Sequence, residues 1–228
     1  MSRPQSERFQ LNTQSECIAK YRAIVERKRV YLFFKRAFDT VVSALLICCL
    51  SPVLIVTALA VGLTSRGGVF FTQRRVGLNG RIFKIIKFRT MVPKAASMGR
   101  EITVGDDKRV TAVGRFIRRI RLDELPQFFN VLTGDMSLIG PRPEVERYVN
   151  QYDDAEQATL LVRPGLSCRA SLLFADEAEL LAAQPDPEKY YVNIIMKQKA
   201  QLNLEYIENM SFAEDIKTFF ATIAHVFK

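Results

Sequence analysis

The sequence predicts a mostly helical α/β membrane protein of the monotopic kind, which enters one leaflet of a bilayer without crossing it. The first observation is a run of 23 residues, 41–63, that contains no charged side chain. At the rise of an α-helix, such a run is long enough to cross a hydrocarbon core of about 30 Å. Two further patterns indicate a small cytosolic domain beside it, namely a β-hairpin signal over residues 69–91 and apolar faces on later helical segments.

The charge-free run carries two features that argue against a simple crossing. Basic residues flank it on both sides, whereas a single crossing helix leaves most of its positive charge on the cytoplasmic side. Ser51 and Pro52 lie at its midpoint, where a proline removes one backbone donor and clashes with the carbonyl four residues earlier. We therefore expect a re-entrant helix-break-helix hairpin, and the alternative is a straight crossing helix with a proline kink. The flanking cations are Lys35, Arg36, Arg66, Arg74 and Arg75.

Three regions are expected along the chain: an N-terminal basic extension over residues 1–31, the membrane hairpin over 32–66 and a cytosolic domain over 67–228. Residues 1–15 are polar and lack the apolar core of a cleavable signal peptide, so this end is expected to stay inside. Residues 17–38 place apolar side chains at helical spacing among basic ones. For the first 28 residues two interpretations stay open, a helix on the membrane surface and a helix packed on its own domain.

The cytosolic region divides into short predicted elements. Residues 69–91 alternate apolar and basic side chains around Leu78-Asn79-Gly80, which predicts a hairpin with its turn there. Gly134 is expected to end a buried helix, and Asp186 with Pro187 is expected to open a later one. The other expectations are a helix over 93–100, a polar loop over 101–108, a basic helix over 111–120, a buried helix over 125–132, a strand passing into an acidic helix over 172–179, a helix over 186–209, and an amphipathic interfacial helix that begins with Ser211 and Glu214 as a capping box.

Composition narrows the classes of function. The formal net charge of +9 fits nucleic acid, an anionic membrane surface or a phosphorylated ligand. The four cysteines lack paired metal-ligand spacing, and two of them lie in the apolar run, so we interpret them as reduced thiols in a cytosolic setting. His225 is the only histidine, which excludes a histidine-based triad and a multi-histidine metal site.

Two adjacent carboxylates, Asp123 and Glu124, lie within a cluster of arginines. Opposite charges favour the ionised form of a carboxylate, so both are expected to be ionised. Neighbouring carboxylates suit a hard cation such as Mg²⁺, and guanidinium groups suit phosphate oxygens. A phosphorylated, Mg²⁺-bound substrate is therefore the first hypothesis, and the alternative is an acidic pair that complements the dipole at the first turn of a helix. The arginines are Arg115, Arg118, Arg119, Arg121 and Arg142.

Three separate motifs carry a resemblance to a known family. They are RLDELPQFFNVLTGDMSLIGPRP at residues 121–143, KFRTM at 87–91 and RPGLS at 163–167. Together they resemble the bacterial sugar transferases, the monotopic phosphoglycosyl transferases, and the resemblance covers residues 32–228. The family has a re-entrant hairpin with a Ser-Pro break, which Ser51 and Pro52 match. The family often continues with Thr-Gly where this chain has Ser167-Cys168.

The resemblance implies an Mg²⁺-dependent phosphoglycosyl transferase. Such an enzyme moves a sugar 1-phosphate from a UDP-sugar to a polyprenyl (undecaprenyl) phosphate and starts the synthesis of a cell-surface glycan or glycoconjugate. Asp123 is then the nucleophile of a covalent aspartyl-phosphosugar, and Glu124 is the principal Mg²⁺ ligand with Asp123 beside it. The expected substrate-binding residues are Lys87, Arg89, Arg118, Pro141, Arg142, Pro143 and Arg163.

The expected partners are the UDP-sugar, the polyprenyl phosphate and lipid of the inner leaflet. The implied location is the cytoplasmic face of a bacterial inner membrane, with residues 67–228 as the catalytic domain. Nucleic acid is not expected because the basic residues lack a recognisable reading motif, and the sequence is compatible with a homo-oligomer. The rival function is a non-catalytic basic peripheral membrane protein that binds anionic lipid, which leaves two carboxylates inside an arginine cluster unexplained.

Overall fold

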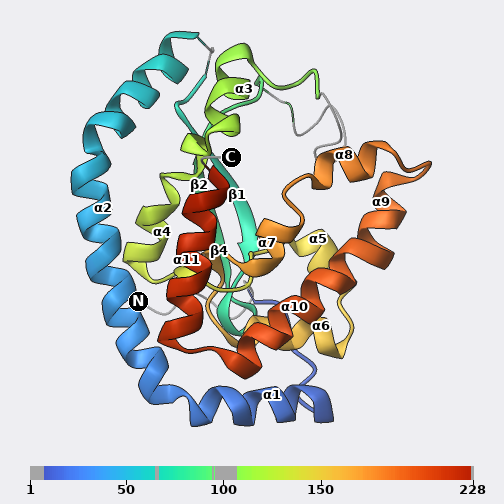
Figure 1. Ribbon diagram of the computed structural model, residues 1–228. Coiled ribbons are helices and arrows are strands. Elements are labelled where there is room, and N and C mark those ends of the chain that lie inside the picture. Colours follow the sequence, from blue (N-terminus) through green and yellow to red (C-terminus); the bar gives the residue numbers. More distant parts are fainter. Residues whose placement is uncertain (1–7, 65–66, 94, 96–106, 227–228) are drawn as a thin grey trace.

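The computed structural model of the protein describes residues 8–64, 67–93, 95 and 107–226. One long helix, α2, forms a whole flank of the molecule, and the other elements lie on one side of it (Figure 1). The strands are β1 Phe70–Val76, β2 Ile82–Phe88, β3 Ser137–Ile139 and β4 Gly165–Ser167. The helices are α1 Glu16–Arg27, α2 Arg29–Thr64, α3 Ala112–Arg119, α4 Gln127–Thr133, α5 Glu146–Val149, α6 Asp154–Ala158, α7 Arg169–Leu173, α8 Glu177–Ala182, α9 Pro187–Tyr190, α10 Met196–Asn209 and α11 Phe212–Val226.

Helix α2 stays helical across Pro52, so the predicted interruption at Ser51-Pro52 is not present. Because proline has no N–H, the carbonyl of Cys48 loses its usual helical donor. The Ser51 hydroxyl donates to that same carbonyl at 2.8 Å and replaces the missing bond. The helix instead curves along its length (Figure 1), as a helix does where a proline disturbs the ladder.

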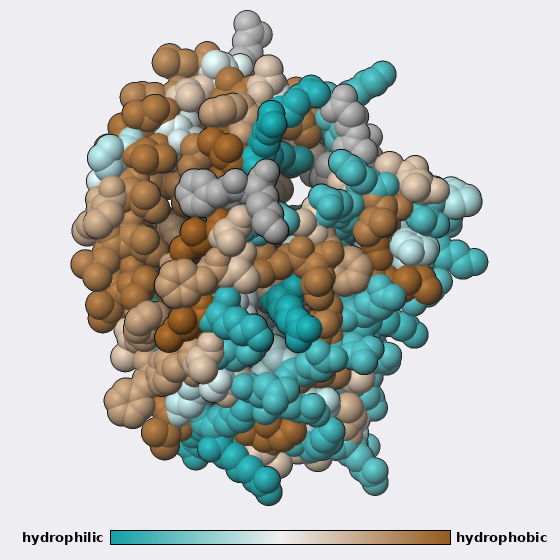
Figure 2. All heavy atoms as spheres, in the orientation of Figure 1, coloured by the Kyte–Doolittle hydropathy of each residue, from teal (hydrophilic) through white to brown (hydrophobic). Residues whose placement is uncertain are grey.

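By length and composition, α2 is the one helix among the described residues that could cross a membrane. Only 11% of its most apolar 18-residue window is buried inside the molecule, so most of this surface is uncovered. The apolar flank is continuous in the space-filling view (Figure 2). Its course relative to a bilayer, re-entrant or crossing, stays a prediction.

The inner face of α2 contacts α4 and α11 by packing and by polar contacts. Apolar side chains near its middle pack on a cluster that includes Phe128 and Val131 of α4. Arg36 donates to the carbonyl oxygens of Val131 at 2.6 Å and Leu132 at 2.9 Å, which binds the C-terminal end of α4 to α2. Lys35 is buried against Asp215 of α11 at 2.7 Å.

The N-terminal region packs on its own domain, which decides between the two interpretations left open for it. Ile18 and Tyr21 of α1 are buried in a cluster with Leu161 and with Ile207 of α10. Helix α1 ends at Arg27 and α2 begins at Arg29, so the predicted continuous helix over 17–38 is divided in two.

The predicted hairpin is confirmed, with β1 antiparallel to β2 and a 3-10 turn at Leu78–Gly80. Asn79 (φ 52°) and Gly80 (φ 74°) adopt the left-handed backbone that such a tight turn requires. A second, parallel pair was not predicted. It joins β3 to β4 and brings two loops that lie far apart in the sequence to the same place.

Several of the other predicted elements are confirmed. Gly134 ends α4 with φ 88°, the basic helix appears as α3, and Asp186 accepts from the backbone N–H of Lys189 at 3.1 Å to cap α9. From Pro187 the chain stays helical to Asn209 through a π-helical segment, Tyr191–Ile195. The predicted strand at 172 is wrong, because α7 contains Leu172 and is capped by Cys168. The predicted helix over 93–100 and most of the loop over 101–108 lie outside the described residues.

Candidate active site

The acidic pair lies on a 3-10 turn, Leu122–Glu124, between α3 and α4. Arg121 begins this turn with φ 58°, a left-handed conformation that costs a non-glycine residue free energy. Helix α4 follows directly and buries Phe128 and Val131 against α2. The turn is therefore attached to a packed element, and its strain is held in place by that packing.

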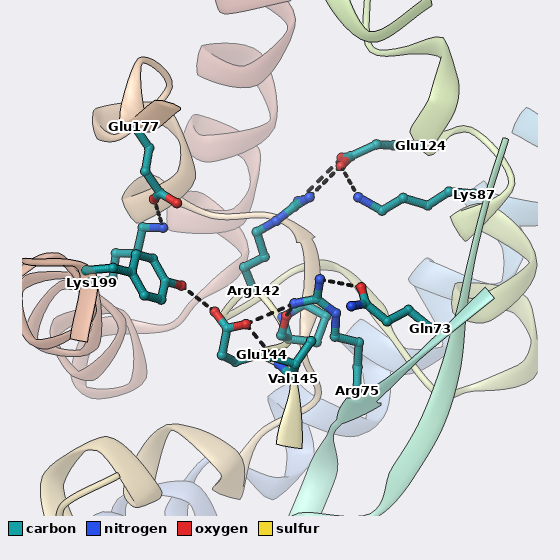
Figure 3. A network of polar contacts seen from close by, with 11 residues as sticks. Gln73, Arg75, Lys87, Glu124, Arg142, Glu144, Val145, Glu177 and Lys199 are labelled. Carbon is teal, nitrogen blue, oxygen red and sulfur yellow. Dashed lines mark hydrogen bonds and ion pairs between the residues drawn. The ribbon is translucent and has the colours of Figure 1, made fainter. Parts of the chain in front are cut away.

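Glu124 is the centre of a tight ionic cluster. Its Oε1 accepts from Lys87 Nζ at 2.8 Å and also pairs with Arg142 Nη2, while Oε2 accepts from Arg142 Nη1 at 3.3 Å. Lys87 comes from β2 and Arg142 from the loop after β3, so three separate segments converge here (Figure 3). The three side chains expose between 14% and 33% of their surface, which leaves them accessible to a ligand.

The Arg142 loop is stiff because two backbones touch where glycines allow it. The Gly165 N–H donates to the Pro141 carbonyl at 2.8 Å, and a Cβ on Gly165 would come within 2.1 Å of the Gly140 nitrogen. No other residue than glycine fits such a contact. The prolines on either side of Arg142 restrict its backbone further, so its guanidinium is pre-positioned.

The electrostatics of Glu124 follow from this cluster. Burial would raise the pKa of Glu124, but the charges of Arg142 and Lys87 outweigh burial and hold that pKa well below its usual value. Burial lowers the pKa of Lys87, which Glu124 partly opposes. Glu124 raises the pKa of Arg142. Glu124 is therefore ionised at neutral pH.

Asp123 differs from its neighbour in the direction of its pKa shift. Burial raises the pKa of Asp123, and the negative charge of Glu124 raises it further. Lys87, Arg118 and Arg142 act in the opposite direction without outweighing those two causes. A buried carboxylate with a raised pKa, held next to cations, is a suitable nucleophile or base.

The other predicted site residues fall into two groups. Arg118 lies near Asp123 and donates from Nε to the Thr90 hydroxyl at 2.8 Å, and Pro141 and Pro143 flank Arg142. The guanidinium of Arg89 lies against Gly67, where a Cβ on the glycine would come within 2.2 Å of its Nη1. Arg163 donates to the Gly134 carbonyl at 3.2 Å, at the end of α4 away from the acidic turn.

The acidic pair fits Mg²⁺ only if a ligand supplies further oxygens. Among the described residues, no group of three or more histidine, cysteine or carboxylate side chains could hold a metal ion. Mg²⁺ is commonly held by one or two carboxylates together with water and substrate phosphates, and Asp123 with Glu124 meets that requirement. For Glu124 to coordinate a cation, part of its pairing with Arg142 and Lys87 must open.

Two hollows adjoin the turn, and sequence reasoning identified neither. An apolar groove of about 690 Å³ lies between α2 and α3 and is lined by Val56, Phe116 and Leu122 among others. A charged cavity of about 340 Å³ is lined by Arg121, Arg142 and Glu144 among others. In the sequence, Glu144 is marked only by its position directly after the GPRP motif, two residues after Arg142.

A family model and individual relatives both connect this chain to bacterial sugar transferases. The family model described as bacterial sugar transferase matches residues 30–228. A UDP-N-acetylgalactosamine-undecaprenyl-phosphate N-acetylgalactosaminephosphotransferase of Aeromonas hydrophila is 40% identical over 197 residues, which is 85% of this chain and 44% of that protein. A UDP-glucose:undecaprenyl-phosphate glucose-1-phosphate transferase of Escherichia coli K12 is 40% identical over 195 residues, 83% of this chain and 39% of that protein.

This chain therefore spans less than half the length of those two relatives. A Bacillus subtilis protein of similar length, named the uncharacterised sugar transferase EpsL, is 34% identical over 195 residues, 86% of this chain and 88% of that protein. The family match covers the apolar helix, the hairpin, the ionic cluster and the helices up to the C-terminus. On this match, the chain belongs to the bacterial sugar transferase family.

Proposed function

We propose that the protein is a phosphoglycosyl transferase, which moves a sugar 1-phosphate from a UDP-sugar to a polyprenyl phosphate and so starts a cell-surface glycan or glycoconjugate. The observation that carries the proposal is the ionic cluster at Glu124 beside the buried Asp123, in a chain of this family. The names of two relatives include a UDP-sugar donor and undecaprenyl phosphate, and these support the donor and acceptor classes.

The reaction proceeds in two displacements at phosphorus. A carboxylate oxygen of Asp123 attacks the phosphorus that bears the sugar, the bond to the bridging oxygen breaks, and UMP leaves with that oxygen and its electron pair. An oxygen of the polyprenyl phosphate then attacks the same phosphorus, and the bond to Asp123 breaks. Asp123 returns as a carboxylate, and the product is a polyprenyl diphosphate sugar.

Lys87 and Arg142 are the residues best placed to bind the donor's phosphates. In the structure they neutralise Glu124, and a diphosphate that enters the cluster competes with Glu124 for both cations. Guanidinium and ammonium groups fixed before the reaction stabilise the charge that develops on the phosphoryl oxygens. Arg118, which lies near Asp123, provides a further cation from α3.

Glu124 is proposed as the principal Mg²⁺ ligand, with Asp123 beside it. Bound Mg²⁺ would offset the negative charge of the diphosphate, against which a carboxylate could otherwise not approach. As the donor draws Arg142 and Lys87 away, the oxygens of Glu124 become available for coordination. Metal and donor are therefore expected to bind together rather than separately.

The lipid acceptor is proposed to reach the site from the apolar side. The groove between α2 and α3 is lined in part by Leu122, one residue before Asp123. It suits the hydrocarbon chain of a polyprenyl phosphate because it is lined almost entirely by apolar side chains. We propose on this basis that α2 lies in the inner leaflet and that the acidic turn faces the cytoplasmic side of the inner membrane.

The test is nucleotide release by the full chain in lipid nanodiscs with Mg²⁺, a panel of UDP-sugars and polyprenyl phosphate. We expect UMP as the nucleotide product, with multiple turnovers only when the lipid acceptor is present and with loss of turnover on chelation. Release of UDP would instead indicate transfer of the sugar alone and would contradict the proposal. Binding to anionic vesicles without any nucleotide release would support the rival, a non-catalytic peripheral membrane protein.

The re-entrant course of α2 has its own test. Single cysteines at positions 10 and 100, in a chain without its native cysteines, should both react with membrane-impermeant reagents only from the cytoplasmic side. The reason is that positive charge on both sides of the apolar run favours the same side of the bilayer. Labels that react from opposite sides would establish a crossing helix.

A further inference from the structure

The charged cavity beside Arg142 contains a second polar network that the transfer mechanism does not use. Arg142 lies between Glu124 and this network in Figure 3. The cavity has a volume of about 340 Å³, which is at the lower end of the range for small-molecule sites. The residues that form its polar wall are Arg75, Glu144, Tyr191, Glu177 and Lys199.

Glu144 organises this network from the loop that also carries Arg142. Its Oε1 accepts from Arg75 Nη1 at 3.0 Å and from the Val145 N–H at 2.8 Å. Its Oε2 accepts from the Tyr191 hydroxyl at 2.5 Å. Arg75, from β1, also donates to the Pro143 carbonyl at 3.0 Å. A carboxylate, a guanidinium and a phenol are thus fixed relative to one another.

These polar groups face the cavity and are not sealed in the core. The side chains of Arg75 and Glu144 keep 20% and 18% of their surface, whereas the buried pair Lys35 and Asp215 keeps 8% and 11%. Within the described part of the chain, Arg75 Nε is buried without a hydrogen-bond partner. A buried donor of this kind costs free energy unless a ligand or water satisfies it.

A second ion pair stands at the far end of the same cavity. Lys199 of α10 pairs with Glu177 of α8 and lies 5.3 Å from the ring centroid of Tyr191. Tyr148 packs against Tyr191 with ring centroids 5.1 Å apart. Around Tyr191 the charges of Arg75 and Glu144 and those of Lys199 and Glu177 therefore cancel in pairs beside aromatic side chains. This part of the cavity suits an uncharged ring that carries hydroxyl groups better than it suits another phosphate.

The position of the network connects it to the donor. Glu144 follows Arg142 by two residues on a loop fixed by prolines and by the Gly140–Gly165 contact. The geometry points to this cavity as the site for a hydroxyl-bearing ring of the nucleotide-sugar donor, with Glu144 and Arg75 as its hydrogen-bonding groups. This inference rests on the proposed function, in which Arg142 binds the donor's phosphates. The donor contains two such rings, the transferred sugar and the ribose.

Equilibrium binding to the full chain in detergent or nanodiscs tests the inference. An Asp123→Asn background prevents turnover, and the probes are UDP-glucose, glucose 1-phosphate, UDP and UMP. Glu144→Gln keeps the shape of the side chain but removes the charge that accepts hydrogen bonds, so we expect UDP-glucose to bind at least about tenfold more weakly. Weaker binding of glucose 1-phosphate with unchanged UMP assigns the sugar to the cavity. Weaker binding of UMP and UDP assigns the ribose, and either result supports the site.

Glu146→Gln is the matched control. Glu146 also pairs with an arginine of β1, Arg74 at 2.7 Å, but the Glu146 side chain is 37% exposed and lies outside the cavity. This variant should bind every probe as the parent does. Tyr191→Phe removes only the hydroxyl that donates to Glu144, and we expect a loss of about threefold to tenfold on the same probes. Thermal unfolding of each variant accompanies the binding measurements.

The outcomes distinguish the assignment of the cavity from the proposed function. If the parent binds UDP-glucose and both Glu144→Gln and Tyr191→Phe bind all probes within twofold of it, the cavity assignment is overturned while the proposed function stands. If Glu144→Gln does not fold, Tyr191→Phe alone decides by the same criterion. If neither this parent nor the chain with its native Asp123 binds any of the probes in the presence of Mg²⁺, the proposed function itself is overturned.

Discussion

The two flanks of the molecule offer opposite environments to a ligand. On one flank, the groove between α2 and α3 is lined by apolar side chains, and most of the apolar surface of α2 is uncovered. On the other, the cavity behind Arg142 is lined by ion pairs and phenols. Two consecutive residues line different hollows, because Arg121 lines the cavity and Leu122 lines the groove. Asp123 follows directly, so the proposed water-soluble donor and lipid acceptor would approach it from different sides.

The largest effect is expected at the boundary itself, from Asp123→Asn. An amide keeps the size of the side chain but is not a nucleophile, so UMP release should fall at least about a thousandfold, with or without the lipid acceptor. Membrane association and thermal stability should persist, which separates chemistry from folding. Retention of more than a few per cent of wild-type turnover would show that another group attacks the phosphorus.

The pH dependence distinguishes the two carboxylates of the turn. Protonation of Asp123 removes the nucleophile, so kcat/KM for the donor should fall tenfold per pH unit below the pKa of Asp123. Because burial and Glu124 raise this pKa, the acidic limb should lie above the usual aspartate value of about 3.9. The pKa of Glu124 is held well below its usual value, so Glu124 stays ionised across this range.

A second variant assigns that acidic limb. Lys87 lowers the pKa of Asp123, so Lys87→Gln should move the limb to higher pH. The matched measurement is circular dichroism over the same pH range, which should show a folded protein throughout. Two results would contradict a buried nucleophile next to these charges. One is an acidic limb of kcat/KM at the ordinary carboxyl pKa in the wild-type protein, and the other is an acidic limb that Lys87→Gln does not shift.

A smaller effect is expected when the apolar flank is changed by Phe116→Ser. Phe116 lines the groove and is 62% exposed, and contact with a lipid chain would cover part of that ring. Loss of the contact should raise KM for the polyprenyl phosphate about tenfold while the rate of the first UMP release stays unchanged. Phe129→Ser, at an exposed aromatic outside the groove, is the control. Equal effects of both variants would argue against the groove as the lipid site.

The smallest effect concerns the middle of α2. Ser51→Ala removes the hydroxyl that satisfies the Cys48 carbonyl and should destabilise the protein by about 1 kcal/mol in thermal unfolding in detergent. Thr40→Ala is the control, because the Thr40 hydroxyl donates to the Arg36 carbonyl in a stretch of helix without proline. Equal losses in both variants would show that the serine has no special role next to Pro52.

Local patterns predicted much of the fold and the centre of the site. The turn at Leu78–Gly80, the helix end at Gly134 and the cap at Asp186 depend on the backbone preferences of one or two residues, which the sequence displays directly. Asp123 and Glu124 were recognisable because the arginines around them are close in the sequence. Arg142 was recognised as part of that arginine cluster, and Lys87 was recognised through the family motif KFRTM.

The features that the sequence did not predict lie where segments distant in the sequence meet. The pairing of β3 with β4 involves three residues on each side and leaves no local pattern. The network at Glu144 joins residues 69 apart in the sequence, and the direction of the Arg163 side chain depends on the position of α4. The raised pKa of Asp123 was missed because burial is a property of the folded protein and outweighed the visible arginines. The helix through Pro52 survived because one hydroxyl replaced one amide.

The contact of Arg36 with α4 joins the acidic turn to the apolar helix. Arg36 belongs to α2 and holds the last carbonyls of α4, whose first residue lies three positions after Glu124. A helix in a bilayer adjusts its tilt when the hydrocarbon thickness differs from its apolar length. With α2 in a bilayer, as we propose, we expect such hydrophobic mismatch to reach the acidic turn through this arginine. Nucleotide release in nanodiscs should then depend on the hydrocarbon thickness of the lipid.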